Sequence, residues 1–74
     1  MAIHDAALVG NLGAVKQLLE GVPSVDVVND DDRTPLYLSA WSGQLHVAAW
    51  LLEQGADVNR RTKQGYTPLF ACAD

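Results

Sequence analysis

Apolar residues in the central part of the chain recur at the spacing of amphipathic helices. Leu36, Ser39 and Ala40 lie at positions i, i+3 and i+4, on one face of a helix. A second stripe with helical spacing follows and consists of Leu45, Ala48, Leu51 and Leu52. The pattern therefore predicts two successive helices, each with one apolar face.

Capping and turn residues border these two stripes. Thr34 can cap a helix with its hydroxyl, and Pro35 suits the first helical position because it has no N–H to leave unpaired. Gly43 and Gly55 follow the stripes, where glycine takes the left-handed conformation that ends a helix. One unit is therefore a helix, a tight turn, a second helix and a longer polar loop.

The same unit recurs at an offset of 33 residues. Thr34-Pro35-Leu36 returns as Thr67-Pro68-Leu69. The same shift, without a gap, also places Ala7 on Ala40, Gly10 on Gly43, Leu12 on Leu45, Leu18-Leu19-Glu20 on Leu51-Leu52-Glu53, and Val25 on Val58. Matches at one offset along the whole chain indicate an internal repeat.

The repeat predicts an all-α solenoid of about two and a quarter units. These units span residues 1–33, 34–66 and 67–74. Helices are expected over residues 3–9, 12–20, 35–42 and 45–54, with a short helix beginning at Pro68. No strand is expected beyond a short pairing at the loop tips.

The repeated residues resemble the ankyrin repeat family. Arg33-Thr34-Pro35-Leu36-Tyr37 and the residues up to Leu45 resemble the first-helix motif of the family, and the stretch from Leu51 to Asn59 resembles its second-helix exit. The family has the same period. The resemblance covers essentially the whole chain and implies an ankyrin-repeat solenoid.

The first unit departs furthest from the family pattern. Met1-Ala2-Ile3-His4 stands in place of the Thr-Pro-Leu motif, as is common in a terminal, capping repeat. The solvent-facing residues expected of such a cap are Asp5, Asn11, Lys16 and Gln17.

Two further departures concern local bracing. The family commonly has a hydrogen-bonding His where this chain has Tyr37 and Phe70, whereas His4 occupies that place in the first unit. Asp32 stands where the next unit has Gly65, and Asp tolerates positive φ better than most residues.

Length and composition limit how the chain is stabilised. A chain of 74 residues buries only ~60% of its unfolded surface, so marginal stability is expected. The single cysteine, Cys72, excludes an intrachain disulfide, and with His4 and His46 it does not supply the four ligands of a structural zinc site. We expect Cys72 to be a small buried residue that allows close helix stacking, and His46 to be exposed.

Charge and motifs exclude several classes of function. The formal net charge of −4 leaves no basic footprint for nucleic acid, and no apolar run approaches the ~20 residues of a membrane span. The chain begins without a signal-peptide pattern, so a cytoplasmic or nuclear location is expected.

We find no phosphate loop, dinucleotide fingerprint or nucleophile–base pair, and therefore expect no enzyme, no cofactor and no metal site. Asp30-Asp31-Asp32 does not have the ligand spacing of a calcium-binding loop. We interpret it as a solvated loop or an acidic contact patch.

The resemblance implies partner binding through the loop tips and the concave side of the first helices. Carried over to this chain, it gives Val28, Asp30, Asp31, Arg33, Trp41 and Ser42 at one junction, and Arg61, Lys63, Gln64 and Tyr66 at the next. The first tip is acidic and the second basic. Trp41 is either an interface anchor or a cover for a neighbouring helix, whereas Trp50 is expected to pack against the protein.

We therefore expect a protein–protein interaction scaffold. The alternatives are a structural segment of a longer repeat array and a regulatory ankyrin domain of a larger enzyme or channel. The third unit stops at Asp74, which suggests a fragment, further repeats, or a partner or second copy that covers this end. The exit Asp57-Val58-Asn59 also resembles those in which Asn is hydroxylated, so Asn59 is a candidate for that modification.

Overall fold

The computed structural model describes the backbone of residues 2–73 and the side chains of residues 2–71. The described residues form five helices: α1 (Ile3–Val9), α2 (Leu12–Leu19), α3 (Pro35–Trp41), α4 (Leu45–Glu53) and α5 (Pro68–Ala73). Every predicted helix is present, with bounds within one residue of those expected. No strand occurs within residues 2–73, so the all-α prediction is confirmed.

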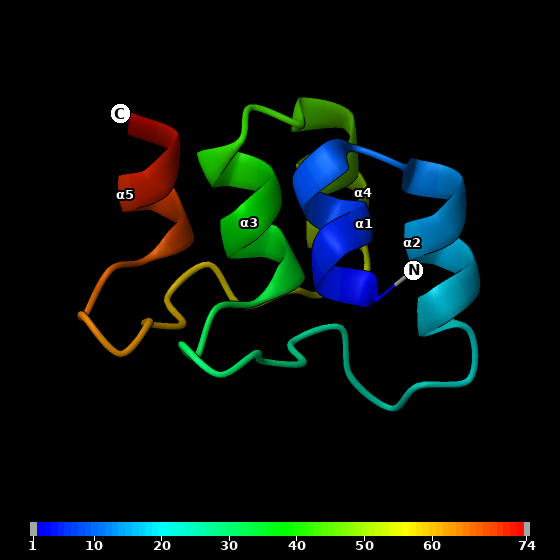
Figure 1. Cartoon of the computed structure of the whole chain (residues 1–74), viewed down its shortest axis with the longest axis horizontal. Coiled ribbons are helices and arrows are strands. Elements are labelled where there is room, and N and C mark those ends of the chain that lie inside the picture. Colours follow the sequence, from blue (N-terminus) through cyan, green and yellow to red (C-terminus); the bar gives the residue numbers. More distant parts are fainter. Residues whose placement is uncertain (1, 74) are drawn as a thin grey trace.

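The helices stack as repeated pairs (Figure 1). The first helices of the units, α1, α3 and α5, lie side by side, so that α3 packs against both of the others. The second helices form another layer, in which α2 packs against α1, and α4 packs against both α3 and α2. The two long loops run together along one end of the stack, next to the start of α3 and of α5.

Helices α3 and α5 each begin at a threonine side-chain cap, as the sequence predicted for Thr34. The Thr34 hydroxyl accepts a hydrogen bond from the backbone N–H of Tyr37 at 3.1 Å, and the Thr67 hydroxyl accepts one from Phe70 at 3.3 Å. These caps satisfy N–H groups that have no partner within the helix. Asp32 takes a φ of 57°, as expected at a position that Gly65 fills in the next unit.

The core lies between the two helical layers. Its fully buried side chains include Val15, Val47 and Leu51, with no exposed surface at all. The expected apolar stripe of α4 is partly wrong, because Leu45 is 66% exposed and Val47 takes its place in the core. Val47 and Leu51 lie one turn apart, on the face of α4 that meets α2 and α3.

The small residues of the first helix allow close packing, as predicted. Ser39 is fully buried, and its hydroxyl donates to the Leu36 carbonyl at 2.9 Å, so no polar group is left unpaired there. The side chain of Cys72, which was expected at a corresponding buried position, lies outside the described residues.

Two polar side chains of the second repeat bond to the turn of the first. Gln44 donates from Nε2 to the Leu8 carbonyl at 3.4 Å, and His46 donates from Nε2 to the Gly10 carbonyl at 2.9 Å. His46 is exposed, as predicted, but it also has this structural partner. These bonds fix the start of α4 against the preceding repeat.

The loops are also tied to the helical layers. The His4 ring bonds through Nε2 to the Val27 carbonyl at 2.9 Å, which is the local bracing that the resemblance implies for this position. The Asp26 carboxylate accepts a hydrogen bond from the backbone N–H of Asp57 at 3.1 Å, across the repeat boundary.

Gly10→Ala is expected to destabilise the fold more than Gly43→Ala. Both glycines have a left-handed φ, of 81° and 77°, so each alanine costs ~1–2 kcal/mol in backbone strain. A Cβ at Gly10 would also lie 2.6 Å from Cδ of Gln44, whereas at Gly43 it would meet open space. Moving Gln44 breaks its bond to Leu8, which adds ~1 kcal/mol. Urea denaturation of both variants measures the difference, and equal losses would show that Gln44 rearranges freely.

Candidate functional site

Each long loop folds into a tight tip before the next first helix. In the first tip, the Arg33 carbonyl accepts from Asn29 N–H at 3.1 Å, and the Asn29 side chain accepts from Arg33 N–H at 3.0 Å. In the second tip, the Tyr66 carbonyl accepts from Thr62 N–H at 2.8 Å, and the Thr62 hydroxyl accepts from Tyr66 N–H at 3.2 Å. Both tips are therefore held by hydrogen bonds within the loop.

The two tips touch each other. The backbone N–H of Lys63 donates to the Asp31 carbonyl at 3.1 Å. This contact places the acidic tip next to the basic one; the sequence predicted the charge of each tip but not the contact. At the tips themselves, the exposed charged side chains are Asp30, Asp31 and Asp32 on the first loop, and Arg60, Arg61 and Lys63 on the second.

A ring contact recurs beneath both tips at the repeat offset. The Arg33 guanidinium lies 5.7 Å from the centroid of the Tyr37 ring, and Tyr66 stacks on Phe70 with centroids 4.5 Å apart. Tyr37 is buried at 5% exposure, whereas Tyr66 and Phe70 remain 41% and 55% exposed. Phe70 was not among the predicted site residues, although its register with Tyr37 and its nearness to Tyr66 could have indicated it.

We call residues 28–33, residues 60–66 and Phe70 the tip surface. It contains eight of the ten residues predicted to bind a partner: Val28, Asp30, Asp31, Arg33, Arg61, Lys63, Gln64 and Tyr66. All of these are exposed except Arg33, which is half-buried. The Arg33 Nε atom is buried and has no hydrogen-bond partner among the described residues.

The other two predicted residues lie apart from the tip surface. Trp41 and Ser42 are at the far end of α3, about 10 Å along the axis from its start, given 1.5 Å per residue. Trp41 is 58% exposed, which agrees with the prediction that it is not part of the core. The Ser42 hydroxyl donates to the Leu38 carbonyl at 2.7 Å, so it is already bound within the helix.

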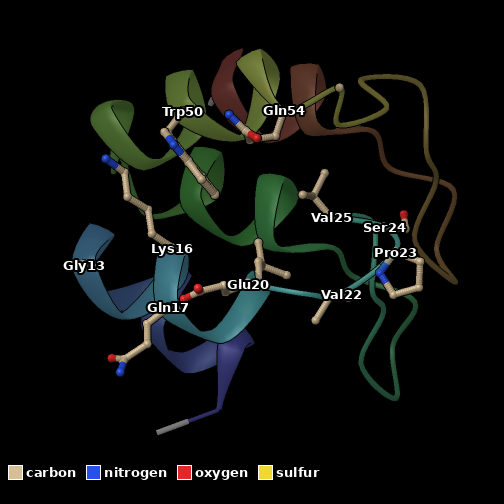
Figure 2. Close-up of a pocket in the computed structure, with 12 residues that line it drawn as sticks. Gly13, Lys16, Gln17, Glu20, Val22, Pro23, Ser24, Val25, Trp50 and Gln54 are labelled. Carbon is tan, nitrogen blue, oxygen red and sulfur yellow. The ribbon is translucent and has the colours of Figure 1, made fainter.

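A separate hollow of about 750 Å³ opens between α2, the loop at residues 22–25 and α4. Figure 2 shows Trp50 and Lys16 on the same side of it, and the Lys16 ammonium lies 5.8 Å from the centroid of the Trp50 ring. Trp50 is half-buried and packs against the core, as predicted. Contact with the core on one hand and with the Lys16 ammonium on the other suits a packing role for Trp50.

The described residues offer little for other chemistries. Within this part of the chain, no group of three His, Cys, Asp or Glu side chains is placed to hold a metal ion. None of the described helices is both long and apolar enough to cross a membrane.

Comparison with known proteins identifies the repeat. The family model described as ankyrin repeats, in three copies, matches residues 2–74. The rat ankyrin repeat and SAM domain-containing protein 6 is 39% identical over 92% of this chain, and the human ankyrin repeat domain-containing protein 53 is 39% identical over 97%. The rice potassium channel KOR2 is 40% identical over 81% of the chain. The matched regions are 8%, 14% and 8% of these relatives. The repeat period, the helix pairs, the caps and the family match all agree. The chain therefore belongs to the ankyrin repeat family.

Proposed function

We propose that the chain is a protein-interaction module that binds its partner through the tip surface. The observation that carries this proposal is the contact between the two tips, which joins an exposed acidic loop, an exposed basic loop and a stacked aromatic pair. Ankyrin repeats are generally protein-interaction modules. Our proposal adds that the partner protein is bound at the tip surface.

The composition of the tip surface suits a protein partner. Tyr and Arg are enriched among the residues that dominate binding energy at interfaces, and this surface contains Tyr66 and Arg33. Its loops are fixed by internal hydrogen bonds, so little conformational freedom remains to be lost on binding. The adjoining acidic and basic loops would select a partner segment with the opposite order of charges.

A second proposal is that this module regulates a larger protein. The supporting observation is the similarity to the rice potassium channel KOR2 and to the mouse inactive serine/threonine-protein kinase TEX14, of which the matched regions are 8% and 5%. In such a protein, the partner of the tip surface would be another domain of the same chain.

A matched cross-linking experiment tests the binding surface. A photo-reactive amino acid replaces Gln64 on the second tip or, as a control, Gln17 on α2; both side chains are exposed. In the cells that make the protein, we expect a discrete cross-linked product from position 64 and not from position 17. Tyr66→Ala in the position-64 protein should reduce that product at least ~10-fold, because an anchor of this type contributes ~2 kcal/mol or more.

Two results would contradict the proposal. A product of equal yield from position 17, or one that is insensitive to Tyr66→Ala, would place the interface elsewhere. Thermal melts of the Tyr66→Ala chain provide the folding control.

A further inference from the structure

The hollow between α2 and α4 is lined by residues at which the first two repeats differ. Trp50 on α4 stands where the first repeat has Gln17, at the 33-residue offset. The loop after α2 also departs from its counterpart, because Val22-Pro23-Ser24 takes the place of Gly55-Ala56-Asp57. Both Trp50 and the loop after α2 line the hollow, which has a volume of about 750 Å³. The hollow is therefore a feature of this particular sequence, at an interface between two repeats that are both present.

The walls of the hollow combine apolar and charged side chains. Lys16 and Glu20 lie one helical turn apart on α2, and both line the hollow. Figure 2 shows the apolar part of the loop on the side opposite Lys16, with the side chains of Val22, Pro23 and Val25. A ligand that fits this hollow therefore needs both an apolar group and a charged group.

The Trp50 ring already has a cation against it. The Lys16 ammonium lies 5.8 Å from the ring centroid, within the ~6 Å over which an aromatic ring attracts a positive charge. Lys16 is exposed, and the side chains of exposed residues change rotamer within nanoseconds. The structure thus places a replaceable cation at the ring, and a ligand cation that interacts more strongly can take its place.

The charges around the hollow favour a positive ligand. Glu20 lines it, and two further carboxylates directly adjoin lining residues: Asp26 follows Val25, and Glu53 precedes Gln54. Lys16 is the only Lys or Arg in the two sequence segments that form the hollow, residues 12–26 and 49–57. The formal net charge of −4 for the whole chain acts in the same direction over a longer range. A cation is therefore attracted to this hollow more strongly than an anion.

We propose that the hollow binds an arginine side chain of a protein partner, together with an apolar residue next to that arginine. A planar guanidinium stacks on an aromatic ring and pairs with a carboxylate through two N–H groups, whereas the ammonium of a lysine is a point charge. An arginine can therefore use Trp50 and Glu20 together and displace Lys16 from the ring. The apolar neighbour would cover Val22 and Pro23. This proposal does not depend on the tip surface, because the two surfaces share no residue.

An anionic ligand is the opposite interpretation of the same hollow, and Lys16 distinguishes the two. If the ligand is a cation, Lys16 competes with it for the Trp50 ring and repels it. If the ligand is an anion, Lys16 is the group that attracts it. Removing the charge of Lys16 therefore strengthens binding in the first case and weakens it in the second. Lys16→Gln makes this change while keeping a residue of similar helix propensity in α2.

A peptide titration tests the proposal with the intact chain. The probe is a synthetic leucine–arginine–leucine tripeptide blocked at both ends, and the control peptide has citrulline, the uncharged analogue of arginine, in the middle. In two-dimensional NMR spectra, the probe should shift the indole N–H of Trp50 in a saturable way. The indole N–H of Trp41, which does not line the hollow, should stay in place. The arginine peptide should bind at least ~fivefold more tightly, because only it gains the ring contact and the carboxylate pair.

Variants of the chain test each contact of the arginine peptide. Lys16→Gln should strengthen binding at least ~twofold, because it removes the competing cation. Glu20→Gln should weaken binding at least ~threefold, whereas Asp5→Asn, which removes an exposed carboxylate from α1, should change it less than ~1.5-fold. Trp50→Leu should abolish the preference for arginine over citrulline. If Trp50→Leu does not melt cooperatively, Trp50→Phe replaces it and should reduce that preference, because phenylalanine attracts cations less than tryptophan does.

Five results would overturn the inference. Weaker binding by Lys16→Gln would identify an anionic ligand, and shifts at the amides of Asp30 and Asp31 instead of the Trp50 indole would place the arginine at the acidic tip. The other three are equal binding of the two peptides, equal effects of Glu20→Gln and Asp5→Asn, and no saturable shift at millimolar peptide. Because the tip surface is read out by cross-linking at position 64, either proposal can fail without the other.

Discussion

Leu51→Ala is expected to lower the free energy of unfolding by ~2–5 kcal/mol, the usual range for a leucine removed from a core. Leu51 has no exposed surface and lies where α4 meets the rest of the core. Native domains hold only ~0.05–0.15 kcal/mol per residue, so this loss is a large share of the total for a chain of 74 residues. Urea denaturation followed by circular dichroism measures it.

Leu45→Ala is the matched control for this variant. It removes the same side chain from the same helix, but Leu45 is 66% exposed and outside the core cluster. We expect a change within ~0.5 kcal/mol, as for most surface substitutions. A loss at Leu45 as large as that at Leu51 would mean that α4 turns the Leu45 face, and not the Val47–Leu51 face, toward the core.

Trp50→Ala is expected to destabilise the fold by ~2 kcal/mol, less than the ~3–5 kcal/mol lost when a fully buried aromatic residue is removed. Trp50 is half-buried, packs against the core cluster, and has Lys16 over its ring. The substitution therefore removes packing between α2 and α4. Thermal and urea denaturation both report this change, and binding of a partner at the tip surface should be unaffected.

Trp41→Ala should show the opposite balance. With 58% of its surface exposed, Trp41 contributes little to the core, and the free energy of unfolding should change by less than ~1 kcal/mol. If Trp41 is an interface anchor, the same variant weakens partner binding by ~2 kcal/mol or more. A Trp41→Ala chain that unfolds, beside a stable Trp50→Ala chain, would reverse the two assignments.

Features that depend on neighbouring residues were predictable from the sequence. Thr34 caps α3 through the N–H of Tyr37, three residues away, and Asp32 adopts the positive φ that its register with Gly65 required. The helix bounds follow from the same short-range effects. Because the fold repeats, the clear sequence pattern of one unit predicts the others. The helix pairs could therefore be placed from the sequence alone.

Features that depend on how the helices face one another were not predictable. The helical pattern of α4 alone does not distinguish Leu45 from Val47 as the core residue; packing against α2 and α3 decides it. The bonds from Gln44 and His46 to the first repeat join residues 36 positions apart.

The candidate site shows the same division between short-range and long-range effects. The charge of each tip was clear from its residues. The contact of Lys63 with Asp31 depends on the stacking of successive loops. The distance of Trp41 from the tips follows from the length of α3, which the predicted helix bounds already contained.

Among the described residues, each helix packs mainly against helices of its own and adjacent units, and this locality has a consequence for how the chain folds. The main packed helix pairs are α1–α2, α1–α3, α2–α4, α3–α4 and α3–α5, so the loops closed by these contacts are no longer than about one repeat. Short loops lose little chain entropy on closure, and a low contact order favours rapid folding. The same locality means that duplicating 33 residues in register would lengthen the stack without altering an existing interface, a route by which such a protein can grow and still fold at every intermediate length.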